Sequence, residues 1–239
     1  MLVIVPAYNE AANIGRALED LSAHAPWADV VVVDDGSTDG TAEVARRFGV
    51  AVLRLPCNLG VGGAVQTGYR YGLLGGYDVA VQFDGDGQHR ADQIRSLVRR
   101  VTEGGAELAV GSRLLEGGGY RFGLLRYLGS RLLAAVVSLI ARQRITDPTS
   151  GFRAAGRRTI RFFAHHYPQS YLGDTTEALV WAARQRMKIV EVPTPMRPRH
   201  SGSSSASNLL GFLHTLRIIL AVLVDCLEPR VPEEPEETK

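Results

Sequence analysis

Short apolar runs alternate with longer amphipathic segments over the first half of the chain. The apolar runs are rich in valine, are bounded by Gly, Pro, Asn or Asp, and span residues 2–5, 30–33, 50–55, 79–83 and 108–110. The amphipathic segments between them span residues 10–24, 39–48, 61–74 and 92–103. Near-continuous apolar strands that alternate with helices are typical of a parallel sheet. We therefore predict an α/β fold with a mostly parallel sheet sandwiched by helices.

The alternation stops beyond residue 113, where the apolar segments become longer. Residues 123–141 are predicted to form an apolar helix that carries Arg126 and Arg131. The pattern further predicts a helix over 174–185, a strand over 188–193 and a flexible loop over 193–208, which is rich in Pro, Ser and Gly. The sequence therefore indicates one large domain over residues 1–205.

The last apolar block, residues 209–227, repeats its polar positions with a helical period. Ser207, His214, Arg217, Asp225 and Glu228 fall on one narrow stripe, which predicts an amphipathic helix over 206–228. A lone membrane span is unfavourable, because each charged side chain at bilayer depth costs roughly 2.5–3.5 kcal/mol. We expect this helix to lie in a membrane interface or to dock a small membrane-protein partner. The alternative is packing on the domain's own core or self-association. Residues 229–239 are expected to be a disordered tail.

The composition, with 45% hydrophobic and 22% charged residues, is that of a globular protein and excludes global disorder. The two cysteines, Cys57 and Cys226, cannot form a disulfide framework, and no Cys/His spacing suits a metal. Residues 1–6 run directly into the polar Tyr8-Asn9-Glu10. We therefore expect a reduced, intracellular protein without a signal peptide.

Charge is distributed unevenly along the chain. Residues 1–112 hold 9 Lys/Arg against 14 Asp/Glu, a net charge of −5. Residues 113–161 hold 10 Arg against two acids, Glu116 and Asp147, a net charge of +8. An acidic half followed by an arginine-only stretch indicates a cation site beside an anion-binding surface. The alternative is that these arginines form a solvated helix face.

Polar residues follow the predicted strands at their carboxyl ends, where ligands bind in open α/β sheets. The strongest motif is Asp84-Gly85-Asp86, because two carboxylates at this spacing can share one hard divalent cation such as Mg²⁺ or Mn²⁺. Asp35 follows the second strand and can hydrogen-bond a ribose or a base. Ser37 or Asp39 is expected to cap the next helix.

Six motifs stand in a fixed order along the chain. They are Val5-Pro6-Ala7-Tyr8-Asn9-Glu10, Val33-Asp34-Asp35-Gly36-Ser37-Thr38-Asp39-Gly40, Asn58-Leu59-Gly60-Val61-Gly62, Asp84-Gly85-Asp86-Gly87-Gln88-His89, Gly111-Ser112-Arg113 and Asp147-Pro148-Thr149-Ser150-Gly151-Phe152-Arg153. In these motifs the chain resembles the family 2 glycosyltransferases, and most closely their dolichyl- and polyprenyl-phosphate sugar synthases. The resemblance covers roughly residues 2–205 and implies a GT-A fold.

The resemblance implies a metal-dependent, inverting transfer of a hexose from a GDP- or UDP-sugar to a polyprenyl phosphate. The implied nucleotide-sugar site comprises Pro6, Tyr8, Glu10, Val33, Asp35, Asp84, Gly85, Asp86 and Arg199. The implied ligands of Mg²⁺ or Mn²⁺ are Asp84, Asp86 and Gln88, and the implied acceptor-phosphate site comprises Arg113, Arg126 and Ser130. Asp86 and Arg113 would act in catalysis. A lipid phosphate is already an anionic nucleophile, so it needs guanidinium groups to hold it rather than a general base.

The implied enzyme would be peripheral on the cytoplasmic face of the cell membrane, with no nucleic-acid partner. One position departs from the family: the lysine expected six residues after Arg199 is replaced by Ser205. His200 and Arg197 are the candidates to take its place. Arg199 and Ser205 belong to the loop that would close over the donor diphosphate, so the missing lysine affects this closure.

Two other functions compete with this interpretation. In many family 2 enzymes that glycosylate hydroxyls, an acidic residue near Asp174 is the general base, so Asp174 would then be catalytic. Asp174 and Glu177 also fit a helix-capping arrangement. The third hypothesis is a non-catalytic scaffold that binds a nucleotide-sugar, against which the intact Asp84 and Asp86 pair argues.

Overall fold

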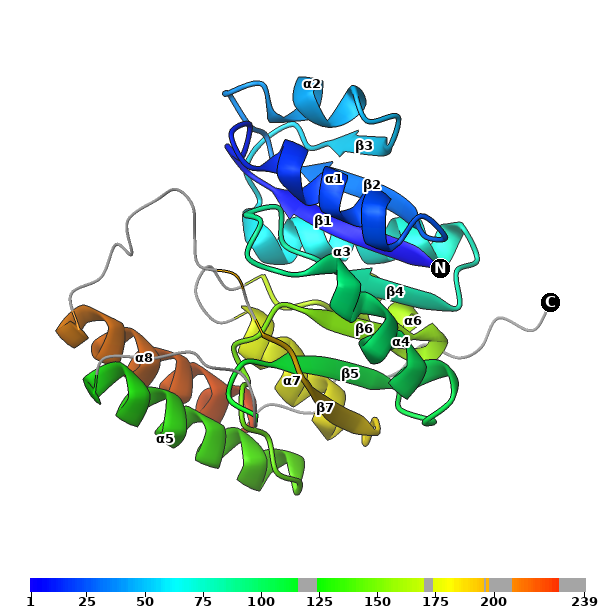
Figure 1. The fold of residues 1–239 in the computed structure, drawn as a ribbon. Coiled ribbons are helices and arrows are strands. Elements are labelled where there is room, and N and C mark those ends of the chain that lie inside the picture. The colour runs from blue at the N-terminus through cyan, green and yellow to red at the C-terminus, as the bar shows by residue number, and fades with distance from the viewer. Residues whose placement is uncertain (116–123, 170–173, 196, 198–207, 228–239) are drawn as a thin grey trace.

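A computed structural model describes residues 1–115, 124–169, 174–195, 197 and 208–227 (Figure 1). Seven strands form one sheet in the order β3-β2-β1-β4-β6-β5-β7. They are β1 (Leu2–Ala7), β2 (Asp29–Asp34), β3 (Ala51–Arg54), β4 (Val79–Gln82), β5 (Leu108–Ser112), β6 (Arg153–Gly156) and β7 (Ile189–Pro193). Only β6 runs antiparallel to its neighbours, β4 and β5, among these strands. The prediction of a mostly parallel sheet is confirmed.

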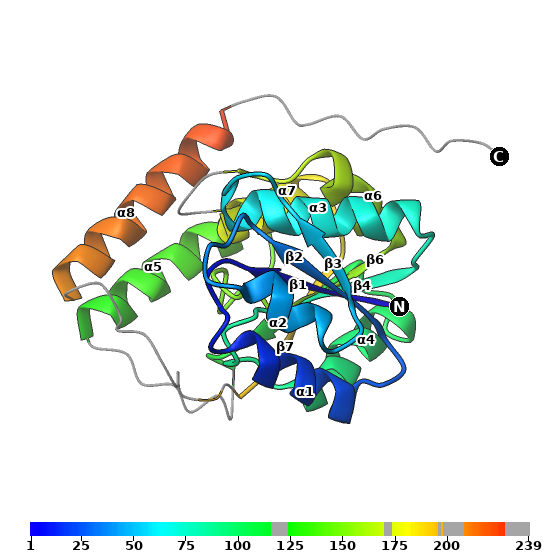
Figure 2. The same cartoon turned by 90° about the horizontal axis from the view of Figure 1, so that it is seen from above.

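Helices cover both faces of this sheet (Figure 2). One face packs against α1 (Ile14–His24), the short η1 (Ala91–Gln93) and α4 (Ile94–Thr102), and the other against α3 (Gly60–Leu74), α6 (Arg157–His165) and α7 (Asp174–Arg184). The short α2 (Thr41–Arg46) lies beside α1. Side chains of a strand point alternately to the two faces. Accordingly Val3 and Val5 belong to the core under α1, whereas Leu2 and Ile4 belong to the core under α3.

The strand β6 and the helix α6 were not predicted from the sequence. The strand reads Arg-Ala-Ala-Gly and lacks the β-branched residues that favour strands. It forms because both of its edges pair, with Ala154 opposite Val81 on one side and Ala109 on the other. The other predicted elements are present with boundaries shifted by a few residues. Most of the loop predicted over 193–208, and all of the tail predicted over 229–239, lie outside the described residues.

The helices α5 (Leu124–Ala141) and α8 (Asn208–Asp225) lie side by side, and α8 also contacts α7 (Figures 1 and 2). One face of α8 is buried: Val222 is fully buried in the same apolar core as Leu133 of α5. Trp181 of α7 donates its indole N–H to a carboxylate oxygen of Asp225 at 2.9 Å. The core packing that the sequence analysis held as an alternative is therefore present on one side of the helix.

The opposite face of α8 is exposed and apolar. It carries Leu213, Leu216, Leu220, Leu223 and Val224, the exposed Arg217 lies beside them, and Leu227 follows just beyond the end of the helix. None of the helices in the described ranges is both long and apolar enough to cross a lipid bilayer. The helix thus has two apolar faces, one that completes the core and one that faces outward.

Val222→Ala is expected to lower the free energy of unfolding by about 1–3 kcal/mol, because it leaves a cavity in the core beneath α8. Leu220→Ala, at a position with 63% exposure on the same helix, is the control and should change stability by less than about 0.5 kcal/mol. Urea denaturation of both variants measures the difference. Equal effects at the two positions would contradict the packing of α8 on the core.

Candidate active site

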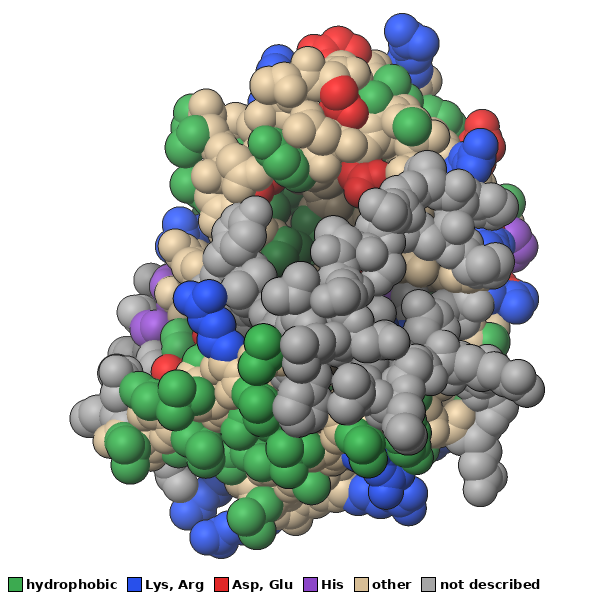
Figure 3. Space-filling view, turned by 90° about the vertical axis from the view of Figure 1, so that its left-hand side faces the viewer, with side chains coloured by type: hydrophobic (Ala, Val, Ile, Leu, Met, Phe, Trp, Pro, Cys, Tyr) green, Lys and Arg blue, Asp and Glu red, His purple; other side chains and the backbone are tan. Residues whose placement is uncertain are grey.

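A cavity of about 430 Å³ opens at the carboxyl edge of the sheet, the side of the molecule that Figure 3 faces. The loops after β1, β2 and β4 and the start of α3 line it with Pro6, Ala7, Tyr8, Glu10, Asp35, Asn58, Gly60, Val61, Ala64, Asp84, Gly85 and Asp86. The structure therefore brings together seven of the residues named for the nucleotide-sugar, namely Pro6, Tyr8, Glu10, Asp35, Asp84, Gly85 and Asp86. Val33 is different, because its side chain is fully buried in the core.

Hydrogen bonds tie the loop after β1 to the loop after β2. Asn9 adopts a left-handed backbone conformation with φ of +53°. Its backbone N–H donates to Ser37 Oγ, and its side-chain oxygen accepts the backbone N–H of Thr38, both at 2.9 Å. The backbone N–H of Glu10 donates to Thr41 Oγ1 at 2.9 Å. Tyr8 is thereby held on the rim of the cavity, where 46% of it is exposed.

Asp35 lies at the base of the cavity and is almost fully buried. Its carboxylate accepts the backbone N–H of Leu59 at 2.7 Å, just before α3 begins at Gly60. Burial raises the pKa of Asp35, and this effect outweighs the hydrogen bonds from Leu59 and Gly60, which lower it. The same carboxylate therefore fixes the segment that leads into α3 and borders the cavity. The prediction that Ser37 or Asp39 is the N-cap of the next helix is wrong, because Gly40 occupies the N-cap of α2; Asp39, one residue earlier, accepts the backbone N–H of Thr41 at 3.1 Å.

Asp84 and Asp86 reach the cavity from the loop after β4. Gly85 between them is buried, and a Cβ there would stand 3.3 Å from the backbone oxygen of Pro6. The ring Nδ1 of the buried His89 accepts the backbone N–H of Asp84 at 3.0 Å, so its hydrogen sits on Nε2, which lies 3.5 Å from Asp84 Oδ2. His89 therefore holds Asp84 in place; it does not line this cavity, but it borders a neighbouring pocket with Asp86.

These two carboxylates suit a hard divalent cation, which prefers oxygen ligands. Gln88 donates its backbone N–H to Asp86 at 3.0 Å, but its side chain does not line the cavity. Within the described residues, no group of three or more His, Cys, Asp or Glu side chains is arranged for a metal. A cation at Asp84 and Asp86 would therefore take further ligands from a bound molecule, as Mg²⁺ does with phosphates.

The residues named for the acceptor phosphate lie on other elements. Arg113 follows β5 and forms an ion pair with Asp147 at 2.7 Å. Ser130 is half-buried on α5, and the side chain of Arg126 and the whole of Arg199 are outside the described part of the chain. Arg197 binds both carboxylate oxygens of Asp20 on α1, at 3.0 and 2.9 Å. Its guanidinium therefore anchors Arg197 to α1, and Arg197 also lines a pocket beside Asp86, while Ser205 and His200 lie outside the described residues.

Asp174 begins the described part of α7 and is buried. One of its carboxylate oxygens has no hydrogen-bond partner within the described ranges. Burial raises the pKa of Asp174, and the charge of Asp84 adds to this, while hydrogen bonds from Thr175 and the charge of Arg153 oppose it. The mutual charge effect places Asp174 within electrostatic reach of the cavity carboxylate Asp84.

The sequence pattern predicts no role for Asp147, Gly151 or Arg153. The spacing of the residues in their motif carries no chemical signal of its own. Asp147 is fully buried beside Arg113, and Gly151 lies against Asp84. Only the antiparallel course of β6, which was not predicted, places this segment at the site.

Comparison with known proteins identifies the class of this protein. Residues 2–167 match glycosyl transferase family 2, and the chain belongs to this family. An undecaprenyl-phosphate mannosyltransferase from Micrococcus luteus is 35% identical over 218 residues, which cover 87% of both chains. A polyprenol monophosphomannose synthase from Mycolicibacterium smegmatis is 32% identical over 214 residues, covering 86% of this chain and 80% of the relative. The chain is accordingly a glycosyltransferase akin to polyprenyl-phosphate sugar synthases.

A similar solved structure is glucosyl-3-phosphoglycerate synthase from Mycobacterium tuberculosis, determined with Mn²⁺, uridine diphosphate and glucosyl-3-phosphoglycerate. It superposes with a TM-score of 0.69 over 95% of this chain and 80% of that one, at 24% sequence identity. This likeness concerns the fold, and the predicted GT-A fold is confirmed.

Asp86→Ala is expected to remove Mn²⁺-dependent binding of GDP or UDP while the protein stays folded, because its side chain borders the cavity from a loop and does not belong to the apolar core. Isothermal calorimetry with Mn²⁺ and each nucleotide measures binding, and a thermal melt checks the fold. Asp78→Ala, which removes an exposed carboxylate paired with Arg157, is the matched control. Unchanged nucleotide binding in Asp86→Ala, or full binding in EDTA, would refute the assignment.

Proposed function

We propose that this protein transfers a hexose from a GDP- or UDP-sugar to a polyprenyl phosphate, with inversion and with a divalent cation. The observation that carries the proposal is the pair Asp84 and Asp86 opening into a cavity at the sheet edge, with Arg113 at the end of a strand of the same edge. The resemblance to two polyprenyl-phosphate mannosyltransferases over most of their length supports this acceptor class.

Each group of residues has a chemical task in this proposal. Tyr8, Glu10 and Asp35 would hold the nucleoside, Pro6 and Gly85 would shape its site, and Val33 could take part only through its main chain. Asp84 and Asp86 would hold the cation, and Gln88 would join them only after its side chain turns into the cavity, which it does not line in this structure. The solved neighbour with Mn²⁺ supports this choice of metal. A bound Mg²⁺ or Mn²⁺ would stabilise the negative charge that develops on the leaving diphosphate.

The acceptor side follows from the charge of a phosphate. Arg113, Arg126 and Ser130 would bind the lipid phosphate, and Arg199 would clamp the donor diphosphate. Because a phosphate oxygen is already ionised, this transfer needs no general base. A radiolabelled-donor assay with polyprenyl phosphate and with soluble sugars tests the proposal. Label transferred only to a hydroxyl acceptor would overturn it.

A second candidate is transfer to a hydroxyl group with Asp174 as general base. The observation that favours it is the buried Asp174, which has an unpartnered carboxylate oxygen in the described chain, lies within reach of Asp84 and has a raised pKa. A base with a raised pKa is better matched to proton transfer near neutral pH. The nature of the acceptor therefore decides whether Asp174 has a chemical role.

If the acceptor is a phosphate, Asp174→Asn should reduce kcat by less than about tenfold, because losing a general base typically costs 10²-fold or more. Steady-state kinetics with polyprenyl phosphate measures this effect, and a thermal melt separates it from loss of fold. A loss of 10²-fold or more at unchanged melting temperature would support the hydroxyl acceptor instead.

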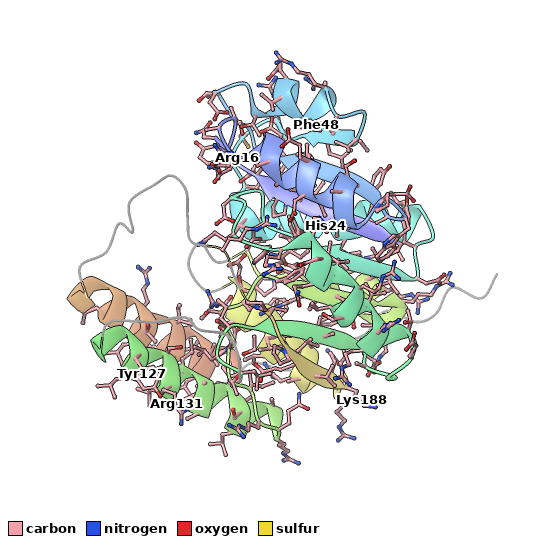
Figure 4. All side chains as sticks on the ribbon, viewed as in Figure 1. Arg16, His24, Phe48, Tyr127, Arg131 and Lys188 are labelled. Carbon is pink, nitrogen blue, oxygen red and sulfur yellow. The ribbon has the colours of Figure 1, made fainter. Side chains whose placement is uncertain are left out.

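We also propose that the enzyme acts at the cytoplasmic membrane face, with the exposed apolar face of α8 and part of α5 in contact with lipid. On α5, the exposed Tyr127, Leu128 and Leu132 lie close to Arg126 in sequence. Tyr127 and Arg131 lie one turn apart on the exposed side of this helix (Figure 4). Aromatic and aliphatic side chains beside arginines are suited to a lipid interface, where the phosphate of the acceptor resides.

The triple variant Leu216→Ser, Leu220→Ser, Leu223→Ser should lose co-sedimentation with anionic liposomes and lose activity on long-chain acceptors more than on short soluble ones. These positions share the outward face of α8, so the core beneath the helix is kept. Leu74→Ser, at 89% exposure on α3, is the control. Undiminished co-sedimentation of the triple variant, or none by the wild type, would contradict the attachment.

A further inference from the structure

The segment 147–152, here called the 147–152 loop, lies between the ends of two strands of the site. Because β6 runs antiparallel between β4 and β5, its beginning arrives at the edge where those two strands end. In register, Arg153 pairs with Gln82 of β4 on one side and with Val110 of β5 on the other. The loop that precedes Arg153 therefore stands between Asp84 and Arg113.

At one end the loop holds Arg113. The carboxylate of Asp147 accepts Arg113 Nε–H and Nη2–H at 2.7 Å each and its backbone N–H at 3.0 Å. Thr149 Oγ1 accepts Nη2–H at 2.7 Å. Burial alone would raise the pKa of Asp147, but the hydrogen bonds and charge of Arg113 hold it below its ordinary value. A two-point fork of this kind fixes both the position and the plane of a guanidinium.

At the other end the loop touches the carboxylate of Asp84. A Cβ added to Gly151 would stand 3.1 and 3.2 Å from the two carboxylate oxygens of Asp84, and 3.0 Å from Gln82 Nε2. The ring of Phe152 stacks on His89 at 4.8 Å between centroids, and His89 accepts the backbone N–H of Asp84. The backbone of the loop thus lies directly beside the Asp84 carboxylate.

Buried polar contacts make the loop rigid. Arg153 is fully buried and donates to the backbone oxygens of Ser150 at 2.8 Å and Pro148 at 3.1 Å. Glu191 of β7 accepts the backbone N–H groups of Thr146 and Asp147 at 2.9 Å. The loop is therefore fastened from β6 and from β7, and its two ends cannot move independently.

We propose that the 147–152 loop is a positioning element that sets the distance between the cation site and the acceptor-phosphate site. Asp147 orients Arg113, and Gly151 leaves room for Asp84, so that one rigid segment fixes both groups. This inference rests on the proposed function for the roles of Asp84 and Arg113. Small displacements matter in such a site, because a misplacement of about 1 Å can cost roughly 10²-fold in rate.

Two substitutions in the one loop should have separate effects. Asp147→Asn keeps the shape of the side chain but loses the two-point contact with the Arg113 guanidinium. It should raise the acceptor KM by about tenfold, in line with the loss of a charge-assisted hydrogen bond. The donor KM and the Mn²⁺ affinity should stay unchanged. Gly151→Ala should weaken Mn²⁺ binding in the presence of nucleotide by about threefold or more, with a smaller change in acceptor KM, because a displaced carboxylate loses ligand geometry. Steady-state kinetics and calorimetry measure the two effects.

Thr149→Val provides a milder variant for the fold, because Thr149 is exposed; its hydroxyl accepts from Arg113 and donates to Asp147 Oδ1 at 3.1 Å, and both bonds belong to the contact under test. Thr149→Val should raise the acceptor KM, as Asp147→Asn does. Asp92→Asn, which breaks the surface ion pair with Arg90, is the matched control and should leave every parameter unchanged. An acceptor KM that stays at the wild-type value, or falls, in both Asp147→Asn and Thr149→Val overturns the inference.

The outcomes also separate this inference from the proposed function. A wild-type protein that transfers nothing to polyprenyl phosphate overturns the proposed function. The calorimetric comparison of Gly151→Ala with wild type still reports on the loop in that case, and unchanged Mn²⁺ binding there overturns its role at Asp84.

Discussion

The antiparallel insertion of β6 between β4 and β5 is the constraint on which the site depends. In a purely parallel sheet, the carboxyl ends of all strands lie at the same edge, and only the segments that follow the strands are found there. Here one strand begins at that edge, so the 147–152 loop, in which Thr149 is exposed, and the buried Arg153 lie between Asp84 and Arg113. Burying a charge is costly unless it is hydrogen-bonded, and Arg153 offsets part of this cost through Nε and Nη2, which donate to the carbonyls of Ser150 and Pro148, while Nη1 has no partner among the described residues. The bonds that offset its burial also give the loop its shape.

The parallel part of the fold could be predicted because its strands are continuous valine-rich runs and its helices have a clear period. The strand β6 could not, because Arg-Ala-Ala-Gly has low strand propensity and is stabilised only by partners that are distant in sequence. The cavity residues could be gathered in advance because each follows a predicted strand. The partners of those residues could not be predicted, because neither the two hydrogen bonds from Arg113 to Asp147 nor the one from Leu59 to Asp35 has a local signal in the sequence.

The helix α8 shows a different limit of sequence patterns. A wide apolar face on a helix predicts burial, but not what it is buried against. In the structure that face divides: Ile218, Ile219 and Val222 enter the domain core, whereas Leu216, Leu220 and Leu223 face outward. In the sequence, the charge of Asp225 argues against insertion of this helix into a membrane. In the structure, Asp225 accepts a hydrogen bond from Trp181 and so helps to pack α8 on α7. Core packing and an outward apolar surface are therefore compatible in one helix.

The distribution of proton-binding groups around the cavity bears on its chemistry. His89 is buried, stacked on Phe152, and its Nδ1 accepts the backbone N–H of Asp84, so this imidazole is committed to structure. Asp35 accepts backbone N–H groups at the start of α3. Asp174, by contrast, is a carboxylate near Asp84 with one oxygen that accepts no hydrogen bond from the described residues. A hydroxyl acceptor would require that oxygen to take a proton, whereas an ionised phosphate would require only cationic groups such as Arg113, whose orientation the fold fixes with a buried carboxylate. A phosphate acceptor would need the Arg113 guanidinium to be held firmly in this orientation. The approach of the nucleophile would then depend on the position of the guanidinium rather than on proton transfer.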